Sequence, residues 1–265
     1  TLSGADGDVA TGGGMFTVDA DSNSDGTGTY SQDDVGSAVT TANGTVSINA
    51  GDVTLTGTID AGTGTALIAP STAVAIGLGG AAGTFTLTDA TADQITASTL
   101  EIGTSTSGAI AIDDFSPANF TTLVLRTDEG VSQGTVDAGI DLTIANLAID
   151  SDTGVDIDVD VSTLAINNAD AASNIQIDSN SASLTIGNVT TSTGAIQGIT
   201  TNGSATIAGA TALTVENAIT ADGTVSLSAV NGVTLSSTNG DVTTNGGTFT
   251  VDADSNNDGT GTYSQ

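Results

Sequence analysis

Apolar and polar residues alternate along almost the whole chain in short runs. TVSINA (45–50), TFTLTD (84–89) and SLTIG (183–187) each place Val, Ile, Leu or Phe at every second position, with polar residues between them. About eighteen such runs can be counted, and a two-residue period is typical of strands with one buried face. Gly, Asn, Asp and Ser fill the gaps, where tight turns favour them. The pattern therefore predicts an all-β protein; residues 90–103 (ATADQITASTLEIG) are the one ambiguous segment.

Three all-β architectures compete for this pattern: a sandwich, a closed barrel and a β-solenoid. Sandwiches and barrels normally bury bulky aromatic cores, whereas aromatic residues make up only 3% of this chain. Small and β-branched apolar residues suit the narrow core of a parallel β-solenoid, in which like residues stack from rung to rung. Rungs of roughly 20 residues give about 13 rungs and a rod about 60 Å long. We expect one continuous solenoid over residues 1–265.

The chain repeats itself at long range. Residues 1–32 and residues 234–265 match at 25 of 32 positions, at an offset of 233 residues. A weaker similarity links residues 42–58 with residues 221–238. The natural interpretation is one repeat period plus an overlap, taken from a longer periodic polypeptide. The expected partner is then the chain itself, continued head to tail along a fibre axis or assembled as a homopolymer.

Charge narrows the range of partners further. The chain has 31 acidic residues against one basic residue, a net charge of −30, and neither His nor Cys. Nucleic acids and anionic membranes are bound through Lys and Arg, so neither is an expected partner. No run of about 18 apolar residues occurs, so no membrane insertion is expected in this segment. The absence of Cys excludes a disulfide framework and a thiolate metal site.

The strand runs also resemble a known family. NGTVSINAGDVTLTGTIDAGTGTALIAPSTAVAIGLG (43–79) and LEIGTSTSGAIAID (100–113) are similar in texture to the strand repeats of giant bacterial exoproteins of the filamentous-haemagglutinin type. The resemblance spans most of the chain, although the family's N-terminal secretion domain has no counterpart in it. It implies a right-handed parallel β-helix, an extracellular or cell-surface location in bacteria, and a role as a surface fibre or adhesin.

The sharpest candidate site is the acidic loop DSNSDGTGTYSQ, residues 21–32. Oxygen-bearing residues stand at positions 1, 3 and 5, Gly at position 6 and a backbone carbonyl at position 7, as in the first half of a Ca²⁺ loop. Gly28 and Gln32 depart from that pattern, since the twelfth position of such a loop is a bidentate Glu. The alternative is a solvated, metal-free turn. The candidate Ca²⁺ ligands are Asp19, Asp21, Asn23, Asp25, Thr27 and Asp33 in the first copy, and Asp252, Asp254, Asn256 and Asp258 in the second.

Two other charged features are candidates for local roles. VDIDVDV (155–161) places three aspartates on one face of a strand, which is either a solvated outer face or a ladder that binds cations. Arg126 is expected to form a local ion pair with Asp128 or Glu129, its neighbours in sequence. DDFSPANF (113–120) is interpreted as an excursion that two phenylalanines pack back against the solenoid.

Catalysis is not expected, because the chain lacks His, Cys and Lys and keeps only carboxylates as acid–base groups. The sequence favours a structural repeat unit of a long extracellular fibre. One alternative is an adhesin stalk that binds a glycan or a cell-surface receptor on a neighbouring cell. A remote alternative is a polysaccharide-acting enzyme that uses two carboxylates.

Overall fold

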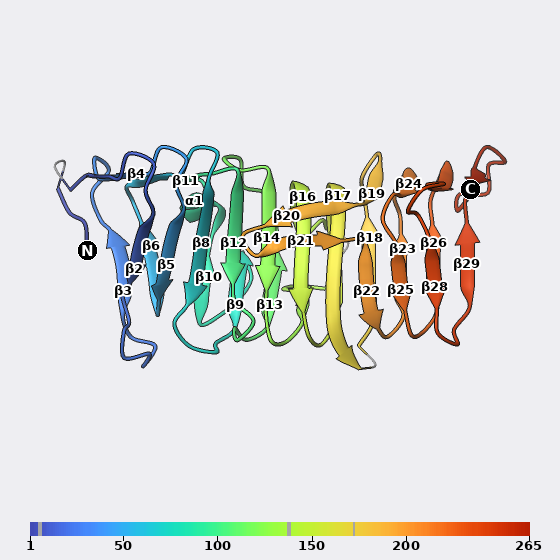
Figure 1. The fold of residues 1–265 in the computed structure, drawn as a ribbon, viewed down its shortest axis with the longest axis horizontal. Coiled ribbons are helices and arrows are strands. Elements are labelled where there is room, and N and C mark those ends of the chain that lie inside the picture. The colour runs from blue at the N-terminus through green and yellow to red at the C-terminus, as the bar shows by residue number, and fades with distance from the viewer. Residues whose placement is uncertain (5–6, 137–138, 172) are drawn as a thin grey trace.

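The computed structural model describes residues 1–4, 7–136, 139–171 and 173–265, and these residues form an all-β structure. Its strands lie side by side along the long axis, and the two termini lie at opposite ends (Figure 1). The one helix among the described residues, α1 (Asp89–Ala92), is a single turn beside the segment whose pattern was ambiguous. The prediction of an all-β protein is therefore confirmed.

The longest feature is an unbroken series of paired parallel strands, which we call the first ladder. Because each strand pairs with the next one in the series, the ladder runs from one end of the molecule to the other. Its ten strands are β2 (Phe16–Asp19), β5 (Val46–Ala50), β8 (Thr65–Pro70), β12 (Thr99–Gly103), β14 (Thr122–Arg126), β16 (Leu142–Ser151), β17 (Val155–Ala171), β22 (Ile199–Asn202), β25 (Ile219–Ala221) and β28 (Val242–Thr244).

Two further ladders run beside the first one, and all their pairings are also parallel. The second ladder comprises β10 (Phe85–Leu87), β9 (Ile76–Gly79), β13 (Ile110–Asp113), β15 (Val131–Gln133), the start of β17, β18 (Ile175–Ser179), β23 (Ala205–Ala208), β26 (Val225–Ser228) and β29 (Phe249–Asp252). The third ladder comprises β19 (Leu184–Ile186), β24 (Ala212–Val215), β27 (Gly232–Leu235) and β30 (Thr262–Ser264). The 17-residue strand β17 takes part in more than one ladder and joins them into one hydrogen-bonded set.

Shorter parallel sheets complete the N-terminal end. One holds β1 (Val9–Ala10), β4 (Ala38–Thr40), β7 (Thr58–Asp60) and β11 (Ile95–Thr96), and the other pairs β3 (Thr29–Gln32) with β6 (Asp52–Leu55). The one antiparallel pair among the described strands is a hairpin of β20 (Asn188–Thr191) and β21 (Gly194–Gln197). In Figure 1 this hairpin lies across the parallel strands rather than along them.

The core consists of aliphatic side chains stacked from strand to strand. In the first ladder one inward position is aliphatic in every strand, and each of its side chains faces the next. The row is Val18, Ile48, Ile68, Ile102, Leu125, Ile149, Ile166, Ile199, Ile219 and Val242; the eight members between the two valines are fully buried. Phe115 and Phe120 are buried in the same core, so the DDFSPANF segment does pack back as expected.

The first ladder has ten strands rather than the expected 13 or so rungs, because the rungs differ in length. Paired residues lie 17 positions apart between Leu142 and Val159, but 34 apart between Thr65 and Thr99. The longer rung contains α1 and the extra strand β10, which lies between β9 and β6. Chain segments of this kind add residues without adding a strand to the first ladder. No helix in the described part of the chain is long and apolar enough to cross a membrane.

Candidate functional site

The first acidic loop closes around the side chain of Asp21. This aspartate is 3% exposed, and its carboxylate accepts hydrogen bonds from the backbone N–H of Gly26 (2.7 Å) and the hydroxyl of Ser71 (2.5 Å). Ser71 follows β8, so this contact ties the loop to another rung. The loop is tight because Gly28 lacks a side chain: a Cβ atom there would lie 2.0 Å from the carbonyl oxygen of Ala20. Asp21 therefore serves as a structural acceptor at the centre of the turn.

Asp25 organises the exposed half of the same loop. Its carboxylate accepts hydrogen bonds from the Thr27 hydroxyl (2.5 Å), the Thr27 backbone N–H (3.0 Å) and the Asn23 side-chain amide (2.7 Å). These donors favour the ionised carboxylate, so they lower the pKa of Asp25 below its ordinary value, the Thr27 hydroxyl contributing most. The oxygens that the sequence nominated as cation ligands are thus engaged by donors of the loop itself.

The second copy of the loop has the same hydrogen-bond pattern. Asp254 accepts from the backbone N–H of Gly259 (2.9 Å), while Asp258 accepts from the Thr260 hydroxyl (2.5 Å) and the Asn256 amide (2.8 Å). The pKa of Asp258 is lowered, first by the Thr260 hydroxyl and then by the Asn256 amide. Equal sequence therefore gives equal local structure 233 residues apart.

The remaining nominated residues lie beside these loops. Asp19 accepts weak hydrogen bonds from the Asp21 backbone N–H (3.3 Å) and the Asn49 amide (3.4 Å), and Asp252 accepts one from the Asp254 backbone N–H (3.2 Å). Asp33 is exposed. Among the described residues, no three His, Cys, Asp or Glu side chains gather closely enough to hold a metal ion. Ca²⁺ binding at the acidic loops stays a prediction.

Arg126, the single basic residue, has partners other than those expected from its neighbours in sequence. Its Nη1 donates to Asp150 at 2.8 Å, and its Nε lies 3.6 Å from a Glu101 oxygen. Its Nη2 donates to the hydroxyls of Thr191 (2.8 Å) and Thr193 (2.6 Å). The expectation of a pair with Asp128 or Glu129 was wrong, because strand register brings residues of β12 and β16 to either side of β14.

The hairpin of β20 and β21 covers the outer face of the first ladder next to Arg126. Glu101 occupies an outward position between the inward residues Leu100 and Ile102, yet it is fully buried. Its carboxylate accepts hydrogen bonds from the backbone N–H and the hydroxyl of Ser192, at the hairpin turn. The arginine and the hairpin together therefore enclose this carboxylate.

A small second apolar cluster lies under the same hairpin. Val124, Ala148 and Ala165 are outward residues of successive strands, and Val189 and Ile196 of the hairpin pack on them. Three consecutive apolar residues in TLVLR (122–126) break the alternation that is seen elsewhere. Such a run is typical of a strand buried on both faces, and it is the signal by which the sequence indicated a covered region.

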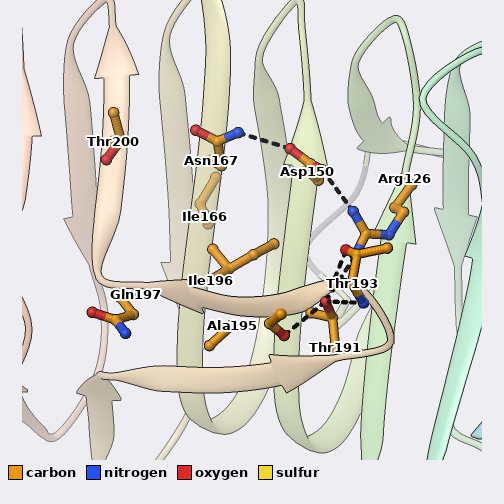
Figure 2. Close-up of a pocket in the computed structure, with 11 residues that line it drawn as sticks. Arg126, Asp150, Ile166, Asn167, Thr191, Thr193, Ala195, Ile196, Gln197 and Thr200 are labelled. Atoms are coloured by element: carbon orange, nitrogen blue, oxygen red, sulfur yellow. Dashed lines mark hydrogen bonds and ion pairs between the residues drawn. The ribbon is translucent and has the colours of Figure 1, made fainter.

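A polar pocket of about 330 Å³ lies between the hairpin and the first ladder (Figure 2). Arg126 and Asp150 lie at one end, and Asn167 donates from its amide to Asp150 at 2.8 Å. Gln197 and Thr200 line the other end. The hydroxyl, amide and carboxylate groups in this pocket offer hydrogen bonds to a polar ligand.

The aspartate row of β17 shows the expected alternation. Val155, Ile157, Val159 and Val161 are buried, whereas the three aspartates between them are exposed or half-buried. This confirms that the aspartates lie on the outer face of the ladder. The pairing of β17 with β18 also places Asp158 directly beside Asp178.

Comparison of the chain with protein-family models, with curated proteins and with solved structures finds no match.

Proposed function

We propose that this chain is a non-enzymatic structural repeat unit of a long β-solenoid fibre. The observation that supports the proposal is the first ladder, in which ten parallel strands and one continuous aliphatic row extend from end to end of the molecule. Along the chain, strands alternate among the ladders, as in successive turns of a parallel β-helix; the resemblance to the filamentous-haemagglutinin type suggests that the coil is right-handed.

Such a fibre is stiff for a simple physical reason. Backbone hydrogen bonds between rungs lie along the axis, so bending the rod strains many of them together, and each rung contacts only its neighbours. Added periods therefore lengthen the fibre without enlarging its core. We propose an extracellular or bacterial cell-surface location, in keeping with the same family resemblance.

The surroundings of the charged groups support a structural rather than a catalytic role. Arg126, the one cationic side chain, holds Glu101, Asp150 and the hairpin in place through its ion pairs and hydrogen bonds. Asp21 and Asp25 serve as acceptors that close a turn. These contacts tie segments of the chain together, which is the work of a scaffold.

Electron microscopy of the native polypeptide tests this proposal. We expect thin, unbranched filaments that persist without ligand, with a mass per length of about 0.5 kDa per Å if the 233-residue period spans about 9 rung spacings of ~4.8 Å. Compact particles of uniform size, or filaments of much greater mass per length, would contradict a single-chain solenoid.

We further propose that Ca²⁺ binds the acidic loops and stabilises the fibre. Support comes from the carboxylates of Asp19, Asp21 and Asp25 within one short loop and from the net charge of −30. Because a ligand that binds only the folded state stabilises it, millimolar Ca²⁺ should raise the melting temperature of chelated protein. Asp25→Asn with Asp258→Asn should abolish that rise. An unchanged melting temperature on addition of Ca²⁺ would remove the metal from the proposal.

The alternative function, an adhesive stalk, is favoured by one observation only. The pocket beside Arg126 is lined by Asn167, Gln197 and Thr200, whose amides and hydroxyl suit a glycan. A glycan array probed with the full chain tests this alternative. Binding that is lost in Gln197→Ala, but not in Ser132→Ala on another face, would support the stalk; the absence of any bound glycan would leave the structural fibre.

A further inference from the structure

The two copies of the 32-residue segment show opposite sides of the same rung. In the first copy, β1, β2 and β3 pair with the strands that follow them along the rod, β4, β5 and β6. In the second copy, the corresponding strands β28, β29 and β30 pair with the strands that precede them, β25, β26 and β27. One rung of this sequence thus has a defined partner on each side.

The registers of these pairings agree strand by strand. Phe16 faces Val46, and its counterpart Phe249 faces Val225, so this inward position is apolar on both sides. The same holds for the tyrosines of the two copies, because Tyr30 faces Val53 and Tyr263 faces Val233.

The third strand of the rung agrees in the same way. Val9 of β1 faces Val39, and its counterpart Val242 of β28 faces Ile219. A rung placed between both sets of partners therefore keeps all three rows of inward side chains in line.

Burial differs between the copies in the way that a missing neighbour explains. Tyr30 is 4% exposed, whereas Tyr263 is 47% exposed; Phe16 is half-buried, whereas Phe249 is 38% exposed. In the first copy the strands of residues 38–55 provide the cover. The edge formed by β28, β29 and β30 consequently presents apolar side chains and unpaired strand backbone, which together favour the addition of a further strand.

The ladders also specify how one period is oriented relative to the next. The first ladder starts at β2 and after nine spacings reaches β28, which is the counterpart of β1 and not of β2. The counterpart of β2 is β29, which belongs to the second ladder. One period therefore advances by nine turns plus one ladder.

We propose that the edge of β28, β29 and β30 receives a second period of this same sequence, beginning with counterparts of residues 33–71 in the register of the first copy. This proposal rests on the fibre function proposed above. Each period is rotated by one ladder, about a third of a turn, and rises about 45 Å at ~4.8 Å per strand. The surface repeats after three periods, about 135 Å.

The rotation has an electrostatic consequence. The acidic loop follows β2 in one period and β29 in the next, so successive loops project from different ladders. Like charges that lie farther apart repel each other less, and salt screens them more fully. A fibre with whole-turn periods would instead align all of these loops on one side.

A two-period chain tests the proposal without removing any part of the protein. In this chain, residues 33–265 follow Gln265 directly, so that residues 234–265 serve both periods. Cryo-electron microscopy should show one straight rod, about 45 Å longer than the single chain, with the second hairpin of β20 and β21 rotated by about a third of a turn. Two bodies joined at a variable angle, or a straight rod with both hairpins on the same side, would overturn the proposal. A straight rod without rotation would still leave the fibre function standing.

A matched pair of variants makes the test specific to the junction. Val251→Asp places a charge in the row of inward side chains at the shared rung, whereas Val136→Asp changes a residue that is already 90% exposed. We expect the first variant to split the two-period rod into two angled bodies and the second to leave it straight. Iodide quenching of the shared-rung tyrosine, in a Tyr30→Phe background, should fall on going from one period to two. Equal quenching in both chains would show that the edge stays uncovered and would contradict the proposal.

Discussion

Removal of the Arg126 guanidinium tests how the hairpin is held against the first ladder. In Arg126→Met the Glu101 carboxylate, which is fully buried, loses its only cation and keeps the two donors of Ser192. At 3.6 Å and an effective dielectric constant near 20, the lost attraction is on the order of 4 kcal/mol. Breaking a buried pair by removing one partner costs about 3–5 kcal/mol. Because the Arg126 and Asp150 side chains are 13% and 30% exposed, we expect the low end, about 3 kcal/mol.

Two measurements follow this loss. Urea denaturation should show a free energy of unfolding lowered by about 3 kcal/mol, and amide hydrogen exchange in β20 and β21 should accelerate by about two orders of magnitude. Adding Glu101→Gln should recover most of the loss, since no buried charge is then left unpaired. Thr200→Ala, in the same pocket but without a contact to Arg126, should stay within about 0.5 kcal/mol of the parent. A loss below 0.5 kcal/mol in Arg126→Met, or a double variant worse than either single one, would refute the reasoning.

The remaining predictions concern the core and two titrating groups. Ile157→Ala removes a fully buried side chain and should lower the free energy of unfolding in urea by about 2–5 kcal/mol; a loss under 1 kcal/mol would argue against a close-packed core. Burial raises the pKa of Tyr30 to about 12, so the stability that this burial confers is complete below pH ~10 and is lost as the pH rises toward 12. Absorbance at 295 nm in Tyr263→Phe should therefore show one late titration, and a midpoint at 10 would contradict the burial. The pKa of Asp25 is lowered, so its contribution is present above the ordinary value of 3.8 and disappears as the pH falls through the lowered one. NMR titration of Thr27→Val should show that the pKa of Asp25 returns toward 3.8, and an unchanged pKa would assign the shift to another cause.

Local features of the fold follow directly from the sequence. Alternation in runs such as VDIDVDV (155–161) predicts which side chains are inward, because a strand places successive residues on opposite faces. The 233-residue offset likewise predicts that both acidic loops share one conformation, which their hydrogen bonds confirm. These predictions succeed because they depend on neighbours within a few residues.

Features that depend on register could not be predicted in this way. Arg126 meets Asp150 and Thr191, which are 24 and 65 residues away, because rungs of unequal length stack in one particular alignment. Nothing close to Arg126 in sequence signals those partners, and the acidic neighbours that were expected to pair with it point to the wrong ones. The number of strands in the first ladder was overestimated for the same reason, since an average rung length ignores the hairpin and α1.

The central claim is that parallel strands stack without interruption along the axis of a fibre. X-ray diffraction from oriented filaments of the native polypeptide tests it most directly. We expect a meridional reflection at about 4.8 Å, from strands stacked along the axis, together with an axial repeat near 45 Å. A 4.8 Å reflection on the equator, or an axial repeat that matches separate globular subunits without a 4.8 Å meridional reflection, would contradict the account.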